Sequence, residues 1–251
     1  HLSQGDSILR WESCLGVGVL DERFVPLMEN FIGRPVTPFP DFTDTSLPPE
    51  RTALAADVLA KAKGRKIIGM IGLERRKGIL TLLRSAELAL QNDLPYYFVC
   101  AGRIFPSEFS AEEWNWISKL GAGDIPNLHF DPSTGRLPSE LDFNSLFSTF
   151  DIAWAAYENF QGSSNTLAKA AAFEIPCVAS ENGCVGHRVS RHRTGLTIPE
   201  QNHLRALDAI SLLLSARDWN GASLEPLYSD FRDQHSPQRL DYLLEELLSK
   251  V

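Results

Sequence analysis

The chain has 251 residues, 43% of them hydrophobic and 22% charged, with glycine and proline spread along its length. This length suits one large domain or two small ones, and the composition is that of a globular protein rather than a disordered or collagen-like one. Acidic residues number 32 against 24 basic ones, which leaves a net charge of -8. Such a surface repels phosphate backbones, so we expect neither nucleic acid nor anionic lipid as the main partner.

The sequence predicts a protein without a transmembrane segment, disulfides or a metal site. Its longest uncharged apolar stretches, such as residues 152–157, are far shorter than the roughly 20 residues that span a bilayer. The first 30 residues lack the pattern of a secretory signal, and the four cysteines show no CxxC spacing. We therefore expect free thiols and a cytoplasmic protein. His187 and His192 have no clear third ligand, so we place both on a helix surface or in a loop.

The N-terminal part of the chain predicts a small unit followed by a connection. Cys14 to Leu20 is typical of a strand and Glu22 to Phe31 of a helix, but one strand and one helix cannot bury a core alone. Residues 1–33 are thus expected to dock on the main domain or to be the remnant of an N-terminal domain. Residues 34–50 carry five prolines and are expected to form a connection to the main domain, residues 51–251.

From Lys66 onward, short apolar runs alternate with longer amphipathic segments, which predicts an α/β fold with a doubly wound parallel sheet. The runs lack polar alternation, so both faces of the sheet are expected to be covered. The expected strands are Lys66 to Ile71, Tyr96 to Ala101, Asp151 to Ala156 and Pro176 to Ser180, with a weaker one at Asn127 to Phe130. Helical spacing follows at residues 79–90, 167–171 and 204–214, and Ser236 with Pro237 is expected to start a last helix.

Ligands of such sheets bind beyond the carboxyl ends of the strands, in the strand-to-helix loops. The loop after the first strand, Gly72 to Gly78, holds Arg75, Arg76 and Lys77 between glycines, which suits an anion. The alternative is a solvated turn in which cations happen to cluster.

The loop after the third of these strands, Glu158 to Thr166, is polar and opens a helix that carries Lys169 one turn inside. Its serines and asparagine are expected to cap the helix and leave N–H groups for a phosphate, unless it is a plain N-cap with nothing bound. The next loop contains Gly183 and Gly186, which would let a ligand approach the backbone closely.

These motifs occur in a specific order along the chain. They are Ile67 to Gly72 with Arg76 to Gly78, Val99 to Gly102, Gly162 to Leu167, Lys169 to Ser180, and Gly183 to Gly186 with Thr194 to Leu196. In this order they resemble the C-terminal, donor-binding, Rossmann-like domain of retaining glycosyltransferases with the GT-B architecture, glycosyltransferase family 4 (group 1 type). The resemblance spans residues 66 to about 215.

The resemblance implies that a nucleotide-sugar, such as a UDP- or GDP-sugar, lies across the carboxyl edge of the sheet. Lys77 matches the phosphate-binding lysine of the family. The arginine of that loop is Leu73 here and the loop is one residue shorter, so we expect Arg75 or Arg76 to substitute. The implied donor and phosphate ligands are Arg75, Arg76, Lys77, Gly162, Ser163, Ser164, Asn165, Thr166 and Lys169. Gly102, Arg103, Glu158, Gly183 and Gly186 are expected near the donor sugar or base.

The sequence departs from the family at its paired glutamates, one near the donor sugar and one on the ribose. The matching positions hold Gln161 and Lys169, so no catalytic residue is assigned. Glu158 lies three residues early and takes the first role only if the loop bulges. A lysine cannot accept hydrogen bonds from ribose hydroxyls, although its charge attracts a diphosphate.

Two functions follow from the resemblance. In the first, the chain is the donor-binding part of a hexosyltransferase, inactive alone, whose acceptor is bound by a missing N-terminal Rossmann domain. In the second, it is a catalytically inactive nucleotide-sugar-binding or interaction module, which the loss of both glutamates favours. Neither needs a cofactor or metal. The missing part could also place the protein at the periphery of a membrane.

Overall fold

The structure is a computed structural model that describes residues 9, 11–123, 125–132, 135, 137 and 139–249. Its main body is a six-stranded sheet in the order β5-β4-β3-β6-β7-β8, and every pairing is parallel. The strands are β3 (Lys66–Ile71), β4 (Tyr96–Ala101), β5 (Leu128–Asp131), β6 (Ile152–Ala155), β7 (Cys177–Ser180) and β8 (Gly195–Ile198). The predicted strands are therefore all present, and the doubly wound, Rossmann-like fold is confirmed.

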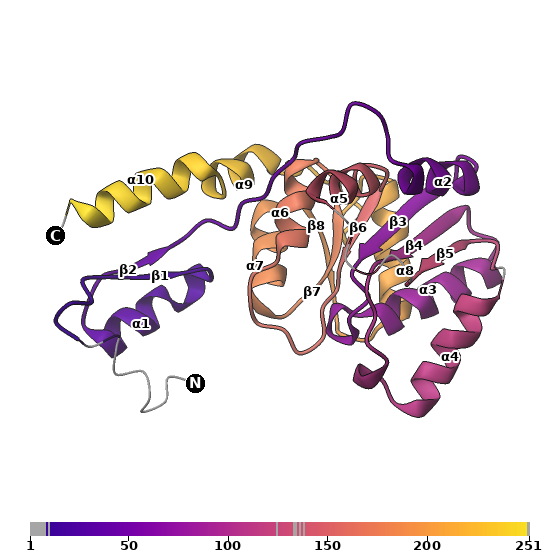
Figure 1. Ribbon diagram of the computed structural model, residues 1–251, viewed down its shortest axis with the longest axis horizontal. Coiled ribbons are helices and arrows are strands. Elements are labelled where there is room, and N and C mark those ends of the chain that lie inside the picture. The colour runs from indigo at the N-terminus through magenta and orange to yellow at the C-terminus, as the bar shows by residue number, and fades with distance from the viewer. Residues whose placement is uncertain are drawn as a thin grey trace.

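Helices cover both faces of the sheet and make three layers (Figure 1). One face carries α3 (Ile79–Gln91), α4 (Ala111–Ala122) and α8 (His203–Leu214). The other face carries α2 (Ala53–Ala62), α5 (Glu140–Phe147), α6 (Asn165–Ala172), α7 (Gly183–His192) and α9 (Tyr228–Gln234). Because neighbouring side chains of a strand point to opposite faces, Ile68 enters the first core and Ile67 the second. This explains why the buried strands lack polar alternation.

Short 3₁₀ turns and side-chain caps set where several elements begin. The turns are η2 (Glu22–Phe24), η3 (Arg75–Lys77) and η4 (Pro106–Glu108). Helix α4 starts with a capping box, in which Ser110 and Glu113 each accept a hydrogen bond from the other's backbone N–H. The predicted cap of the last helix is confirmed, since Ser236 Oγ accepts from the N–H of Arg239 at 3.1 Å.

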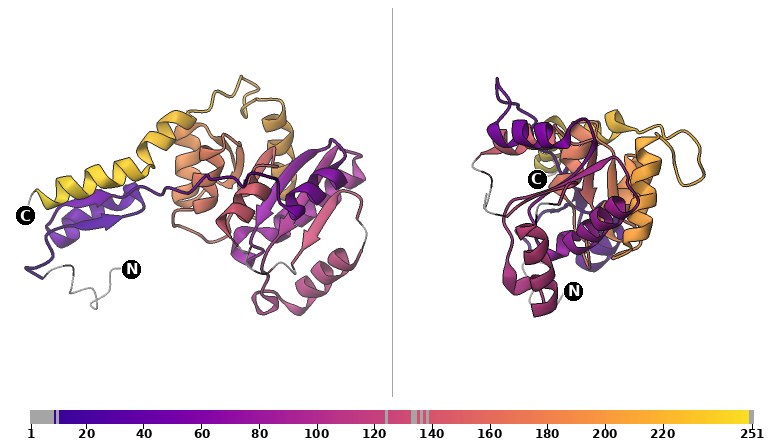
Figure 2. Two further views of the ribbon diagram at one scale, coloured as in Figure 1. Left: turned by 45° about the horizontal axis from the view of Figure 1, so that its top comes forward. Right: turned by 90° about the vertical axis from the view of Figure 1, so that its right-hand side faces the viewer.

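The N-terminal residues form a separate small unit with the C-terminal helix. Strands β1 (Val17–Val19) and β2 (Val36–Pro38) pair in parallel around α1 (Val25–Ile32), and α10 (Pro237–Leu248) runs beside them (Figures 1 and 2). Strand β2 lies inside the segment expected to be a connection, so the stretch without helix or strand starts at residue 39 and ends at residue 52. The prolines predict an irregular segment there, but parallel pairing with β1 makes residues 36–38 a strand.

The structure also differs from the expected elements at two places near β7. The expected strands do not include β8 (Gly195–Ile198), a short strand that begins with glycine. An added Cβ at Gly195 would lie 1.9 Å from the Cys177 carbonyl oxygen, so close packing against β7 requires this glycine. The expected glycine loop after β7 is instead the start of helix α7.

All four cysteines are free thiols, as expected. Burial raises the pKa of Cys177 to about 12, so this thiol stays protonated at neutral pH. None of the helices in the described part of the chain combines the length and hydrophobicity that a membrane crossing needs.

The junction between the N-terminal unit and the main body contains a histidine that must stay neutral. His235 Nδ1 accepts a hydrogen bond from the Asp41 N–H at 3.0 Å, and Phe231 stacks on the ring at 4.3 Å. Burial, assisted by the charge of Arg188, lowers the pKa of His235 to about 3. Between this value and the ordinary 6.5, the unfolded chain binds a proton that the folded chain does not. Acidification through this range therefore destabilises the fold.

We expect the melting temperature to fall by roughly several degrees from about pH 7 to about pH 5. In His235→Gln, whose side-chain oxygen can still accept from Asp41, the decrease should be smaller, whereas His203→Gln should match the wild type. Circular dichroism melts of the three proteins at both pH values test this. Equal pH slopes in all three would contradict the assignment to His235.

Candidate functional site

A cavity of about 720 Å³ lies where the strand order reverses, beyond the carboxyl ends of β3 and β4. Strand β4 lies on one side of β3, and β6 lies on its other side. This reversal of the strand order separates the loop that follows β3 from the loop that follows β6. The described residues that line the cavity are Ile71, Gly72, Glu74, Lys77, Gly102, Arg103, Gly135, Leu137, Ser139, Glu140, Phe143 and Asn165. Of the predicted site residues, it thus brings together Lys77, Gly102, Arg103 and Asn165.

Lys77 packs directly on the end of β3. Its Nζ donates to the carbonyl oxygen of Ile71 at 3.1 Å, and an added Cβ at Gly72 would lie 2.5 Å from the same nitrogen. Gly72 has φ +82°, which also favours glycine. Burial lowers the pKa of Lys77, although Glu74 partly offsets this effect. An anion in the cavity would replace the lost hydration of this ammonium group.

Arg75 and Arg76 do not join Lys77 in the cavity. The Arg75 guanidinium binds Glu113 at 2.9 Å and Glu158 at 3.2 Å, and the Glu113 carboxylate raises the pKa of Arg75. Arg76 binds Glu74 at 2.6 Å and lies 5.3 Å from the ring centroid of Phe160. Both arginines are therefore held by side chains of the protein, so that the cluster of three cations seen in the sequence is dispersed in the fold.

Glu158 lies behind this loop, is 3% exposed, and does not line the cavity. One of its oxygens accepts from Arg75 and from the Gln201 amide at 3.0 Å. Its backbone N–H donates to the Arg76 carbonyl at 2.7 Å. Glu158 thus holds the loop after β3 through Oε2 and its backbone N–H, while its buried Oε1 has no hydrogen-bond partner among the described residues.

The loop after β6 caps α6 as expected. Ser164 Oγ accepts from the Leu167 N–H at 3.4 Å and also bonds the Tyr157 hydroxyl at 2.7 Å. Thr166 Oγ1 contacts the same hydroxyl at 3.2 Å. Asn165, the first residue of α6, lines the cavity, whereas Gly162, Ser163, Ser164 and Thr166 do not. The loop thus brings the positive end of α6 to the cavity through Asn165.

Lys169 does not line the cavity and is fully buried. Its Nζ donates to the Asp44 carbonyl at 2.9 Å, to Asn144 Oδ1 at 2.5 Å, and to the carboxylate of Glu140. The Asn144 amide also donates to the carbonyls of Asp44 and Ser46. The charge of Lys169 therefore holds the connection against α5 and α6, and Lys169 does not lie among the lining residues where a phosphate ligand was expected.

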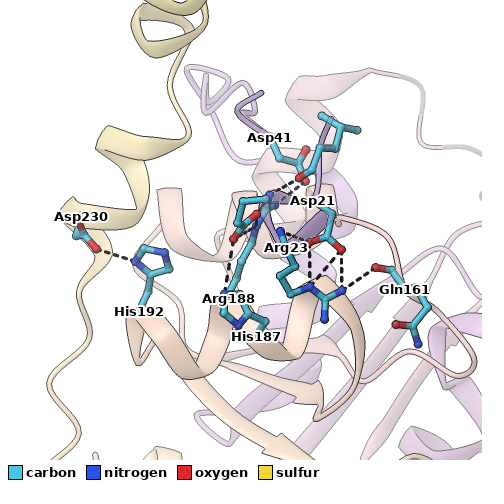
Figure 3. A network of polar contacts seen from close by, with 10 residues as sticks. Asp21, Arg23, Asp41, Gln161, His187, Arg188, His192 and Asp230 are labelled. Atoms are coloured by element: carbon cyan, nitrogen blue, oxygen red, sulfur yellow. Dashed lines mark hydrogen bonds and ion pairs between the residues drawn. The ribbon is translucent and has the colours of Figure 1, made fainter. Parts of the chain in front are cut away.

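Gly183 and Gly186 serve packing within the protein. An added Cβ at Gly183 would lie 2.4 Å from the Phe160 carbonyl oxygen, and one at Gly186 would lie 2.4 Å from that of Ser180. The backbone of Gln161 is engaged in the same region, where its carbonyl accepts from the Arg23 guanidinium at 3.4 Å (Figure 3). The glycines let α7 approach the sheet, and neither lines the cavity.

Arg188 of α7 organises a polar network beside this helix (Figure 3). Its guanidinium binds Glu22 at 2.9 Å, donates to the Leu20 carbonyl, and lies 3.6 Å from Asp41. Asp21, Glu22 and Cys184 lie close enough together to hold a metal, but arginines already engage both carboxylates. Burial raises the pKa of the Cys184 thiol to about 12, which further disfavours metal binding.

The two histidines of α7 differ. His187 is 41% exposed on the helix, as expected. His192 is 1% exposed, and its Nδ1 lies 2.8 Å from Asp230 Oδ2. The expectation of a surface or loop position is therefore wrong for His192, because α9 covers this end of α7.

Comparison with known proteins identifies the family. Residues 65–216 match the family described as glycosyl transferases group 1. This chain belongs to that family. A search of the curated proteins found no match.

Solved structures of other proteins show the same fold. Sucrose-phosphate synthase from Thermosynechococcus elongatus has a TM-score of 0.66 and 18% identity, over 98% of this chain and 60% of its own. Anabaena HepE, solved with UDP, has a TM-score of 0.70 and 15% identity, over 94% of this chain and 64% of its own. The C-terminal domain of a group 1 glycosyl transferase from Francisella tularensis has a TM-score of 0.54 and 17% identity, over 75% of this chain and 92% of its own. The chain thus spans about 60% of the longer proteins.

The sequence did not predict one part of the cavity lining, which we call the α5 wall. This wall consists of Leu137, Ser139, Glu140 and Phe143, just before and within the start of α5. The one signal in the sequence was the Ser139 cap, whose Oγ accepts from the Asp142 N–H at 3.2 Å. That signal locates a helix start but does not show that the helix faces the end of β3.

We expect Lys169→Met to lower the free energy of unfolding by about 1–3 kcal/mol, because the Asp44 carbonyl and Asn144 Oδ1 would lose a buried donor. Lys119→Met, on the exposed face of α4, should change it by less than about 0.5 kcal/mol. Urea titrations followed by circular dichroism measure both. Equal midpoints for the two variants would show that the buried contacts of Lys169 do not hold the connection.

Proposed function

We propose that the chain is the donor-binding part of a glycosyltransferase of family 4. In the whole protein, it would transfer a hexose-type sugar from a nucleotide-sugar, with retention, to an acceptor bound by an N-terminal Rossmann domain. The observation that carries this proposal is the position of Lys77 over Gly72, at the switch point of the sheet, in a cavity of about 720 Å³. Membership of the group 1 family and the UDP found with HepE support it.

The two walls of the cavity suit different parts of a nucleotide. Lys77 and the α6 N-terminus at Asn165 would balance the charge of the diphosphate, with no metal cofactor. Glu140 of the α5 wall would accept hydrogen bonds from ribose hydroxyls, the role that Lys169 cannot perform. Phe143 and Leu137 would contact the base, which we take to be that of a UDP- or GDP-sugar.

A second candidate is a catalytically inactive nucleotide-sugar-binding module. The observation that favours it is the engagement of the two family glutamate positions within the protein, where Gln161 contacts Arg23 through its carbonyl and Lys169 holds the connection. Both candidates bind donor at the same cavity, and only the first transfers sugar. For either we propose a cytoplasmic site, with peripheral membrane contact through an N-terminal part as the alternative.

We expect the chain to be stabilised by one of UDP, GDP or ADP, or by their sugar conjugates. A ligand at about 100 times its dissociation constant adds about 2.7 kcal/mol, a shift of roughly 5 to 10 °C for a chain of this size. Lys77→Ala should lose most of this shift because its ammonium group faces the diphosphate. Thermal unfolding with each nucleotide measures the effect.

Lys119→Ala, on the surface of α4, is the matched control and should keep the full shift. Absence of a shift with every nucleotide would contradict donor binding by this chain. A shift that survives in Lys77→Ala would place the nucleotide elsewhere. Transfer or hydrolysis of the sugar by the protein extended with its N-terminal domain would then separate the enzyme from the inactive module.

A further inference from the structure

The carboxylates that line the cavity already have cationic partners outside its lining. Glu74 lies 2.6 Å from the Arg76 guanidinium and 3.8 Å from Lys77 Nζ. Glu140 is paired with Lys169, which is buried behind the wall. Among the described residues of the lining, the charges left to balance are therefore those of two cations, Lys77 and Arg103.

Arg103 is the less constrained of these two cations. It is exposed at the end of β4, and its guanidinium lies 4.3 Å from the ring centroid of Phe105. Within the described part of the chain, no carboxylate lies within 4 Å of it. Stacking on Phe105 orients the planar guanidinium but leaves its N–H groups available for an anion.

The backbone fixes Arg103 close to the site of Lys77. The Leu73 N–H donates to the Arg103 carbonyl at 2.9 Å, so the loops after β3 and β4 are joined at this residue. An added Cβ at the preceding Gly102 would lie 3.0 Å from the Gly72 nitrogen, and an added Cβ at Gly72 would in turn lie 2.5 Å from Lys77 Nζ. Arg103 and Lys77 thus lie on adjacent loops that meet at the contact between Gly72 and Gly102.

We propose that Arg103 binds the diphosphate of the donor together with Lys77, in the place expected for Arg75 or Arg76. This inference rests on the proposed function. Arg75 is held between two carboxylates, and Arg76 by Glu74 and Phe160, so turning either arginine to the cavity would break the ion pairs that hold it. A guanidinium can form two parallel hydrogen bonds to phosphate oxygens, which complements the single ammonium group of Lys77.

The test is isothermal titration of UDP, GDP and ADP into the wild-type chain and into Arg103→Gln, at low and high NaCl. For the nucleotide that binds, Arg103→Gln should reduce affinity roughly 10-fold or more at low salt, since a hydrogen bond to a charged group is lost. The decrease of affinity with added salt should also be shallower in Arg103→Gln. Arg103→Lys should recover part of the affinity because it keeps the charge.

Arg84→Gln is the matched control. Arg84 is also an exposed arginine over an aromatic ring, 5.8 Å from the centroid of Trp116, but it lies outside the cavity. It should bind the nucleotide as the wild type does. Wild-type binding that is equally tight in Arg103→Gln would overturn the role of Arg103 and leave the proposed function intact. Failure of the wild type to bind any of the three nucleotides would overturn both.

Discussion

The contact between Gly72 and Gly102 is the constraint on which the proposed site depends. The ends of β3 and β4 approach so closely there that a side chain on either residue would displace Lys77 or the neighbouring backbone. The Gly72 N–H donates to the Ala101 carbonyl at 2.8 Å, which extends the ladder of the sheet into the loops. Lys77 and Arg103 are consequently placed by strand pairing rather than by the local sequence of their loops. A rigid sheet edge of this kind positions charges before a ligand arrives.

Buried cations also hold the N-terminal part of the chain to the main body. Lys169 holds the carbonyl of Asp44 against α5 and α6, and Arg188 binds Glu22 and the Leu20 carbonyl beside α7. Both cations are buried, and these oxygens offset the cost of removing their charges from water. The lysine at the position where a glutamate was expected therefore has a structural explanation. It binds the connection, and through Glu140 it also supports the α5 wall of the cavity.

Much of the fold was predictable because its strands are buried on both faces. Lys66 to Ile71 and Tyr96 to Ala101 match β3 and β4 at both ends, since a continuous apolar run has no other stable location. Strand β2 and helix α7 were missed, because proline in one and glycine in the other argued locally for loops. In both places a tertiary contact decides the outcome: pairing with β1, and the close approach of α7 to β7.

A site residue could be predicted only where its position depends on its own loop and not on contacts with distant segments. Lys77 follows β3 directly, so its position could be inferred from the sequence, whereas the roles of Arg75 and Arg76 depend on Glu113, Glu158 and Glu74. A cation contributes to anion binding only to the extent that nearby carboxylates leave its charge uncompensated. Counting basic residues along the loop therefore overstates its positive charge. Arg103 is a single arginine in the sequence of its loop, yet its charge stays uncompensated because the fold places no carboxylate of the described chain beside it.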